Sequence, residues 1–133
     1  MEGQNNLLKL TYYKVKSFHY EVNEEFYNLN QPIEVPLRVK SNLNEIDKDN
    51  FSLDLEAIIS NAEKFPFNLT VIIEGGFMAV DWEKAMKQIE LKTTAILFPY
   101  MRALLTTLTA TAGINPIILP IVNVEELINR SKE

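Results

Sequence analysis

Apolar and polar side chains alternate with a period of two through most of the first eighty residues, which predicts strands with one buried face. Residues 33–43 show this most clearly, because an apolar side chain stands at every second position from Ile33 to Val39. Pro36 has no N–H to give to a neighbouring strand, so this strand is expected at a sheet edge or at a bulge. Residues 50–60 repeat the alternation, with an apolar face made of Phe51, Leu53, Leu55, Ala57 and Ile59.

Two further segments complete the predicted sheet. Residues 65–80 alternate in the same way, and Gly75-Gly76 near their end indicates a bulge or a bend. Residues 7–22 are rich in β-branched and aromatic side chains, but Lys14 and Lys16 interrupt their apolar even-numbered positions, so we expect a bulge there. Together the four segments predict an antiparallel meander that is exposed on one side.

After Val80 the repeat lengthens to the spacing of a helix. Asp81 is placed to cap a first segment, whose apolar positions are Trp82, Ala85, Met86 and Ile89. Residues 93–112 form a longer segment, in which Pro99 predicts a kink unless it lies in the first turn. Its apolar face consists of Leu97, Tyr100, Met101, Leu104, Leu105 and Leu108. A second face, which would let another helix approach closely, consists of the small residues Ala103, Thr106, Thr107 and Ala110.

The last part of the chain is expected to leave the long helix and return in a short one. Gly113 is a natural helix end. Residues 114–122 are apolar but contain Pro116 and Pro120, so they predict an extended hydrophobic loop. Asn123 then caps a short final helix, with a glutamate at the reciprocal capping position.

Composition narrows the possible functions. A chain of 133 residues and 15.3 kDa, with 47% hydrophobic and 23% charged residues, is expected to fold as one globular domain. It has no cysteine, which excludes disulfides, thiolate metal sites and cysteine nucleophiles. Its net charge of −5 argues against a nucleic-acid partner. With Glu2 where a signal peptide would carry positive charge, and no apolar run long enough to span a membrane, we expect a cytoplasmic protein.

The chain lacks the residue groupings that catalysis needs. His19 is its one histidine, and its place between Phe18 and Tyr20 predicts a partly buried structural residue. No serine or threonine stands in a nucleophile elbow. Asp47 and Asp49 lack the rest of a calcium loop, and the paired glycines lack the lysine of a phosphate loop. We therefore expect no enzyme, no metal and no cofactor.

Two motifs resemble the SecB family, tetrameric export chaperones that hold precursor polypeptides unfolded. Residues 96–102, Ile-Leu-Phe-Pro-Tyr-Met-Arg, resemble the helix signature Ile-Leu-Phe-Pro-Tyr-Ala-Arg of that family, and Leu119-Pro120-Ile121-Val122-Asn123 resembles its proline-rich loop ending in Pro-Val-Asn. The spacing between the motifs and the Gly75-Gly76 pair agree with the family. The resemblance implies an α+β fold, a four-stranded antiparallel sheet with a long helix packed on it and a short C-terminal helix. One domain would span residues 1–133, with the sheet in 7–80 and the helices and crossover loop in 81–130.

The resemblance also implies a function. A SecB-like chaperone binds unfolded or extended polypeptides in hydrophobic grooves and keeps precursor proteins competent for translocation. Carried over by position, the groove candidates are Phe77, Ile114, Ile117, Leu119, Val122 and Leu127, with core packing as the alternative for each. Such chaperones are homotetramers, in which two subunits pair into an eight-stranded layer and two dimers pack through their long helices. The face made of Ala103, Thr106, Thr107 and Ala110 is then the dimer–dimer contact, or else a solvent face.

The chain also departs from the family. Acidic residues that dock the SecA motor on the exposed sheet face are replaced by Val15, His19 and Val71, while Asp54 and Glu56 could form a different acidic patch. Three interpretations stay open. The protein is a general export chaperone with altered motor contacts, or a chaperone dedicated to one client, such as the antitoxin of a toxin–antitoxin pair. The third is a SecB-fold scaffold or small-ligand-binding protein without an open groove.

Overall fold

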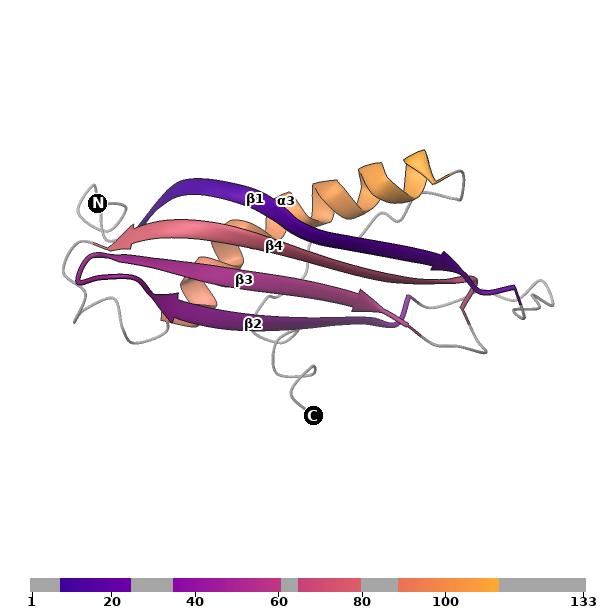
Figure 1. The fold of residues 1–133 in the computed structure, drawn as a ribbon, viewed down its shortest axis with the longest axis horizontal. Coiled ribbons are helices and arrows are strands. Elements are labelled where there is room, and N and C mark those ends of the chain that lie inside the picture. The colour runs from indigo at the N-terminus through magenta and orange to yellow at the C-terminus, as the bar shows by residue number, and fades with distance from the viewer. Residues whose placement is uncertain (1–7, 25–34, 61–64, 80–88, 113–133) are drawn as a thin grey trace.

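Four strands and one long helix form the part of the chain that the computed structural model describes, residues 8–24, 35–60, 65–79 and 89–112 (Figure 1). The elements are β1 (Leu8–Val22), β2 (Leu37–Glu45), β3 (Asn50–Ile59), β4 (Phe67–Ala79) and α3 (Ile89–Thr111). The strands make one sheet in the order β1-β4-β3-β2, in which every neighbouring pair is antiparallel. Helix α3 crosses one face, the helix side, and the other face, the open face, carries no described element.

The order of the strands corrects the predicted meander. β2, β3 and β4 follow one another as neighbours, as a meander requires, but β1 pairs with β4 and not with β2. The alternation of a strand defines its buried face, whereas its neighbour depends on a contact distant in sequence. β1 and β2 are therefore the two edge strands.

The second strand begins later than its alternation suggests. β2 starts at Leu37, directly after Pro36, whereas the pattern predicted a start at Ile33, which lies outside the described residues. At the proline the chain turns back on itself, and the Leu37 N–H donates to the Val35 carbonyl at 2.9 Å. The expected edge position is confirmed, because β2 is the last strand of the sheet and pairs with β3 alone. A proline is tolerated at such an edge, where no second neighbour strand needs its N–H.

The core lies between the sheet and α3. The apolar faces predicted for the two central strands are buried as expected, at every odd-numbered position of β3 and β4. α3 packs mainly on β3 and also touches β2 and β4. A hydrogen bond of 2.8 Å from the Ser41 hydroxyl to a carboxylate oxygen of Glu90 ties the edge strand β2 to the first turn of the helix.

The buried face of α3 differs in part from the predicted one. Leu97, Met101 and Leu105 are fully buried, and Leu104 and Leu108 are half-buried against the core. Tyr100, however, is 41% exposed. The buried face of the helix is rotated away from Tyr100 relative to the predicted one. It also includes Thr93, Thr94, Phe98 and Thr109. A buried threonine can satisfy its hydroxyl within the helix: Thr109 donates to the Leu105 carbonyl at 2.7 Å, four residues earlier.

The helix is longer than predicted and contains its proline. α3 starts at Ile89 and not at Thr93, so Pro99 lies in its interior rather than in its first turn. Asp81, the segment 82–88, Gly113, the loop 114–122 and the final helix from Asn123 are outside the described residues.

Gly75 and Gly76 predicted a bulge or a bend in β4, and the bulge of the sheet at this point has its extra residue on β1 rather than on β4. β4 pairs with β3 without a register shift through Gly75 and Gly76. A Cβ at Gly75 would lie 3.0 Å from Leu97 on the helix side, and a Cβ at Gly76 would overlap the ring of Tyr12 on the open face. Because neither glycine has a side chain, Leu97 from the helix and the ring of Tyr12 approach the backbone of β4 closely from opposite faces of the sheet.

Candidate functional site

The bulges lie in β1 and decide which of its side chains face the helix side. Pairing with β4 moves two residues along β1 for one along β4 at two places, so Thr11 and Lys16 are the inserted residues. The predicted bulge near the lysines is confirmed at Lys16. On the helix side, opposite the buried odd-numbered residues of β4, stand seven apolar or aromatic residues: Leu8, Leu10, Tyr13, Val15, Phe18, Tyr20 and Val22.

Four of these seven are exposed although they belong to the apolar row. Tyr13, Val15, Phe18 and Val22 keep between 45% and 54% of their surface in solvent, because α3 packs mainly on the other three strands. We call these four residues the β1 strip. An exposed apolar row on an edge strand is unusual in an isolated domain and typical of a contact surface.

The exposed tyrosine of α3 closes one side of the β1 strip. The rings of Tyr13 and Tyr100 lie with their centroids 4.7 Å apart at an angle of 41°. This is the ring contact that joins the edge strand to the helix, and it explains why Tyr100 leaves the core. Sequence periodicity could not indicate it, because both tyrosines find their partner through the tertiary fold.

On the open face, directly behind the strip, four polar side chains form a connected cluster. The Tyr12 hydroxyl donates to a carboxylate oxygen of Glu74. The Lys16 ammonium lies 3.0 Å from an oxygen of Asp54 and 3.7 Å from one of Glu74. The hydrogen bond from Tyr12 holds the pKa of Glu74 below its ordinary value and raises the pKa of Tyr12, while the contact with Asp54 raises the pKa of Lys16. These shifts favour an ionised Glu74, a protonated Tyr12 hydroxyl and a charged Lys16, which are the forms that bind one another.

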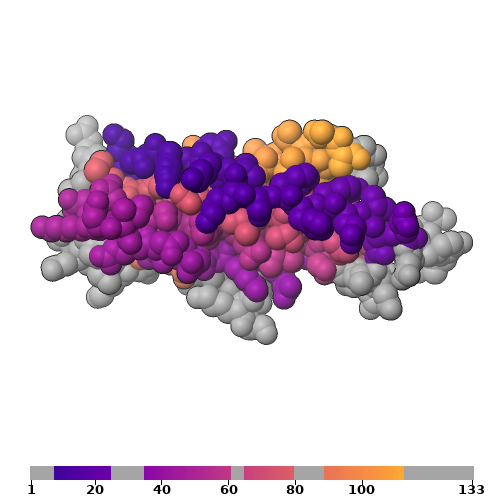
Figure 2. All heavy atoms as spheres, in the orientation of Figure 1, coloured from indigo at the N-terminus to yellow at the C-terminus, as the bar shows by residue number. Residues whose placement is uncertain are grey.

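Val15, His19 and Val71, which stand where the SecB family has motor-docking acids, do not lie on one face of the sheet. Val71 is buried in the core and Val15 faces the helix side, so His19 is the one of the three on the open face. His19 is exposed there, which corrects the expectation that it is partly buried. The alternative acidic patch is also absent as a free patch, because Asp54 pairs with Lys16 and Glu56 stands opposite Lys40 in the β2–β3 register. Figure 2 shows this face, with β1 along one long edge.

The small-residue face of α3 points away from the sheet. Ala103, Thr107 and Ala110 are exposed and Thr106 is half-buried. Thr106 donates its hydroxyl to the Arg102 carbonyl at 3.2 Å. A hydroxyl that is bonded to the helix backbone leaves its methyl group towards the outside, so this face is less polar than its composition suggests.

Of the six groove candidates, Phe77 is the one inside the described residues. It is 1% exposed, and its ring stacks on Phe51 with centroids 5.5 Å apart. Its burial agrees with the alternative of core packing, since a side chain at this depth contacts another chain only if the core opens. The remaining five lie outside the described residues: Ile114, Ile117, Leu119, Val122 and Leu127.

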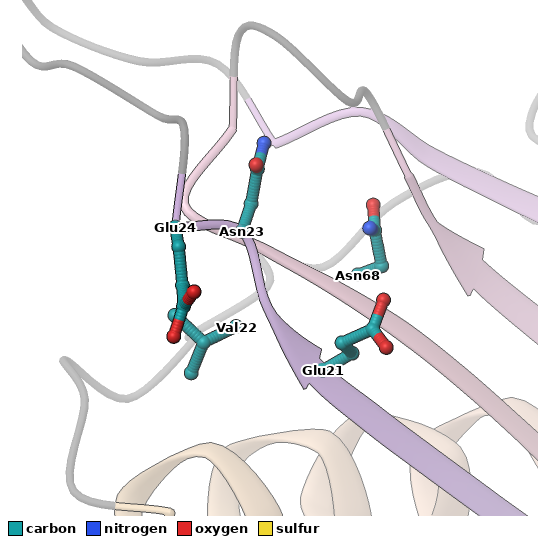
Figure 3. A pocket seen from close by; sticks show the side chains of 5 residues that line it. All are labelled: Glu21, Val22, Asn23, Glu24 and Asn68. Carbon is teal, nitrogen blue, oxygen red and sulfur yellow. The ribbon is translucent and has the colours of Figure 1, made fainter.

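A polar hollow lies where β1 ends, between Glu21, Val22, Asn23, Glu24 and Asn68 (Figure 3). Glu21 and Asn68 are cross-strand partners, and the Asn23 side chain donates to the Phe65 carbonyl at 3.0 Å. The lining is too polar to hold an apolar segment. Within residues 8–24, 35–60, 65–79 and 89–112 no three acidic or histidine side chains are placed to share a metal ion, and no helix is long and apolar enough to cross a membrane.

Comparisons with known proteins point in one direction. A family model described as preprotein translocase subunit SecB matches residues 2–133. The uncharacterized protein MJ0357 of Methanocaldococcus jannaschii is 32% identical over 134 residues, which cover 95% of this chain and 85% of that protein.

Solved structures agree on the fold. A SecB-like chaperone of Mycobacterium tuberculosis, Rv1957, in complex with a ChAD peptide from the HigA1 antitoxin, superposes with a TM-score of 0.71 at 12% identity, covering 91% of this chain and 95% of that one. A protein of unknown function from Streptococcus agalactiae gives a TM-score of 0.58 at 14% identity over 86% and 97% of the two chains. At such identities the likeness concerns the fold: an antiparallel four-stranded sheet with a long helix, as in SecB-like proteins.

Proposed function

Because the chain belongs to the SecB family, we propose that it is a molecular chaperone that holds unfolded polypeptides through apolar surfaces and keeps them competent for translocation. The observation that carries this proposal is the match of the family model from residue 2 to residue 133. The charge pattern supports it. Between Thr93 and Val124, a stretch that contains four of the groove candidates, Arg102 is the one charged residue.

A surface of this kind selects for unfolded chains by simple physics. Burial of apolar area contributes roughly 25 cal/mol per Å² and depends little on sequence. Several weak contacts along one extended client add up through their high effective concentration, whereas a short peptide engages few of them. A folded protein presents no extended apolar segment, so it would bind poorly.

The assembly that we propose is a homotetramer built as a dimer of dimers. Two surfaces are candidates for its contacts, the β1 strip and the small-residue face of α3. The β1 strip lies on an edge strand and is self-complementary in an antiparallel arrangement, as a two-fold contact requires. The α3 face has no charged residue among Ala103, Thr106, Thr107 and Ala110, and small side chains allow two helices to approach closely.

A second candidate function is a chaperone dedicated to one client. It is favoured by the Mycobacterium tuberculosis neighbour, a SecB-like chaperone bound to a peptide of an antitoxin. Docking to the SecA motor receives the least support, because two acids of the open face, Asp54 and Glu74, are already paired with Lys16. We therefore propose polypeptide holding without assigning delivery to the motor.

The first experiment is capture of the tagged protein from its own cells, with the bound chains identified by mass spectrometry. Many unrelated precursors with signal peptides would support a general export chaperone. One recurrent partner would instead identify a dedicated chaperone. Recovery without bound chains, together with no effect on the aggregation of a chemically unfolded protein, would favour a SecB-fold scaffold or small-ligand binder.

A substitution tests the groove. We expect Ile114→Asp to weaken binding of a permanently unfolded polypeptide by at least about tenfold, because a buried isoleucine contributes about 1.5–3 kcal/mol and a charge there would be desolvated. Fluorescence anisotropy measures the affinity. The matched control is Ile46→Asp, since Ile46 is 61% exposed beside the β2–β3 turn. Equal affinities of the two variants, with unchanged circular dichroism and mass, would remove residue 114 from the groove.

A further inference from the structure

The continuity of the β1 strip depends on two inserted residues. Between the bulges at Thr11 and Lys16, the alternation of β1 is reversed, so Tyr13 and Val15 join the helix side while Tyr12 and Lys14 face the open side. A side chain changes face whenever the register slips by one residue. If the bulge at Lys16 were lost, the residues on one side of it would exchange faces, and the strip would be cut in two.

A bulge leaves one residue unpaired and interrupts the ladder of hydrogen bonds, so side-chain contacts at the point of insertion add to what holds the strand there. The Lys16 side chain reaches across β4 to Asp54 on β3, at 3.0 Å, and lies 3.7 Å from Glu74 on β4. One lysine therefore links three strands at the point of insertion.

The first bulge is held by the same group of residues. Tyr12, which follows the inserted Thr11, lies over Gly76 so closely that a Cβ there would overlap its ring. Its hydroxyl donates to Glu74, the residue that Lys16 also approaches. Lys14 stands opposite Glu74 in the ladder and adds to the positive charge around that carboxylate. Both bulges are thus tied to Glu74 from the open face.

We propose that Tyr12, Lys16, Asp54 and Glu74 form a register clamp on the open face, which holds the bulged β1 so that the β1 strip stays continuous on the helix side. The four are positioning residues, which act through the pairing of β1 with β4. The inference rests on the proposed function in one respect, that the strip is the contact between subunits. The clamp itself concerns only the pairing of β1 with β4.

Backbone amide exchange of the full chain tests the clamp. In Lys16→Met, which keeps the alkyl stem and removes the charge, we expect the β1 amides to exchange roughly three- to tenfold faster than in the original protein, while those within β2 and β3 keep their rates. Tyr12→Phe removes one donor and should give a smaller change in the same amides. The matched control is Lys9→Met, on the same strand and face, where Lys9 stands opposite Met78 and has no ion pair with a described residue.

The dependence of β1 exchange on salt tests the clamp independently. Ion pairs at the surface are screened, so about 1 M salt should accelerate β1 exchange in the original protein and in Lys9→Met but not in Lys16→Met. All exchange is measured at a concentration where sedimentation gives the original protein and the three variants the same mass. Equal β1 exchange rates in Lys16→Met and Lys9→Met would overturn the clamp.

Dilution then separates the clamp from the assembly. If Lys16→Met loosens β1 and also shifts the dissociation of the assembly to higher protein concentration, both the clamp and the subunit contact are supported. If it loosens β1 while dissociation is unchanged, the clamp stands and the β1 strip is not the contact between subunits.

Discussion

At the scale of single residues, the paired glycines show how one dipeptide serves two faces. Gly75 faces the helix side and meets Leu97, a fully buried side chain, whereas Gly76 faces the open side and meets Tyr12, which is 40% exposed. Nothing in the sequence around the two glycines distinguishes them. What differs is whether the side chain that lies where a Cβ atom would be is able to move.

This difference predicts unequal effects of two alanine substitutions. Gly75→Ala is expected to destabilise by about 1–3 kcal/mol, because Leu97 is held in the core and overpacking shifts the backbone. Gly76→Ala is expected to cost less, since the Tyr12 ring can swing into solvent and give up its hydrogen bond to Glu74. Urea unfolding followed by circular dichroism compares them, and a Gly76→Ala variant less stable than Gly75→Ala would contradict the explanation.

At the scale of elements, α3 is fastened to the sheet unevenly. It packs mainly on β3, is hydrogen-bonded to β2 through Ser41 and Glu90, and reaches β1 through the Tyr13–Tyr100 ring contact. In Figure 1 the helix runs obliquely behind the strands, from the C-terminal end of β2 to beyond β1. The start of the helix is therefore tied to one edge strand, and its middle meets the other.

The link at the first turn of α3 is measurable by a double-mutant cycle. Ser41→Ala and Glu90→Ala should each lower the free energy of unfolding, and together they should show a coupling of about 0.5–1.5 kcal/mol, because each removes the same hydrogen bond. Ser60→Ala, at an exposed position just after β3, replaces Ser41→Ala in the control cycle. Additive effects of Ser41→Ala and Glu90→Ala would mean that the hydrogen bond does not contribute to the attachment of the helix.

At the scale of the whole molecule, two surfaces with few polar groups stay partly exposed among the described residues, one on an edge strand and one on the outside of the helix. They lie on different elements, and a dimer of dimers needs two separate surfaces, since each subunit must make two distinct two-fold contacts. The open face contributes neither. Glu56 stands opposite Lys40 and Asp54 pairs with Lys16, which favours solubility of that face over docking.

Disruption of the helix face tests the proposed assembly. We expect Ala103→Arg to convert tetramers to dimers, because an arginine is too large and too charged for a close contact between helices. Ala112→Arg is the control, since Ala112 is also exposed but lies on the opposite side of the helix axis by the 100° rotation per residue. Sedimentation equilibrium measures the mass. A tetramer that persists in Ala103→Arg would exclude this face as the dimer–dimer contact.

The alternation of side chains was sufficient to define the buried faces of β3 and β4, the edge position of β2 and the existence of the long helix. These features depend on residues close together in the chain, whose side chains are clearly either apolar or polar. The two motifs were likewise enough to indicate the family, which the comparison of the whole chain confirms. The absence of a cysteine or of a nucleophile elbow is a property of composition and spacing alone.

The tertiary structure decided what depends on distant partners. The place of β1 beside β4, the exact insertion points at Thr11 and Lys16, and the turning of Tyr100 towards Tyr13 each require a neighbour far away in the sequence. A bulge in particular is defined only by comparison with the opposite strand, because the inserted residue looks ordinary in its own segment. For that reason the apolar row of β1, which the lysines seemed to interrupt, proved continuous once the sheet was assembled.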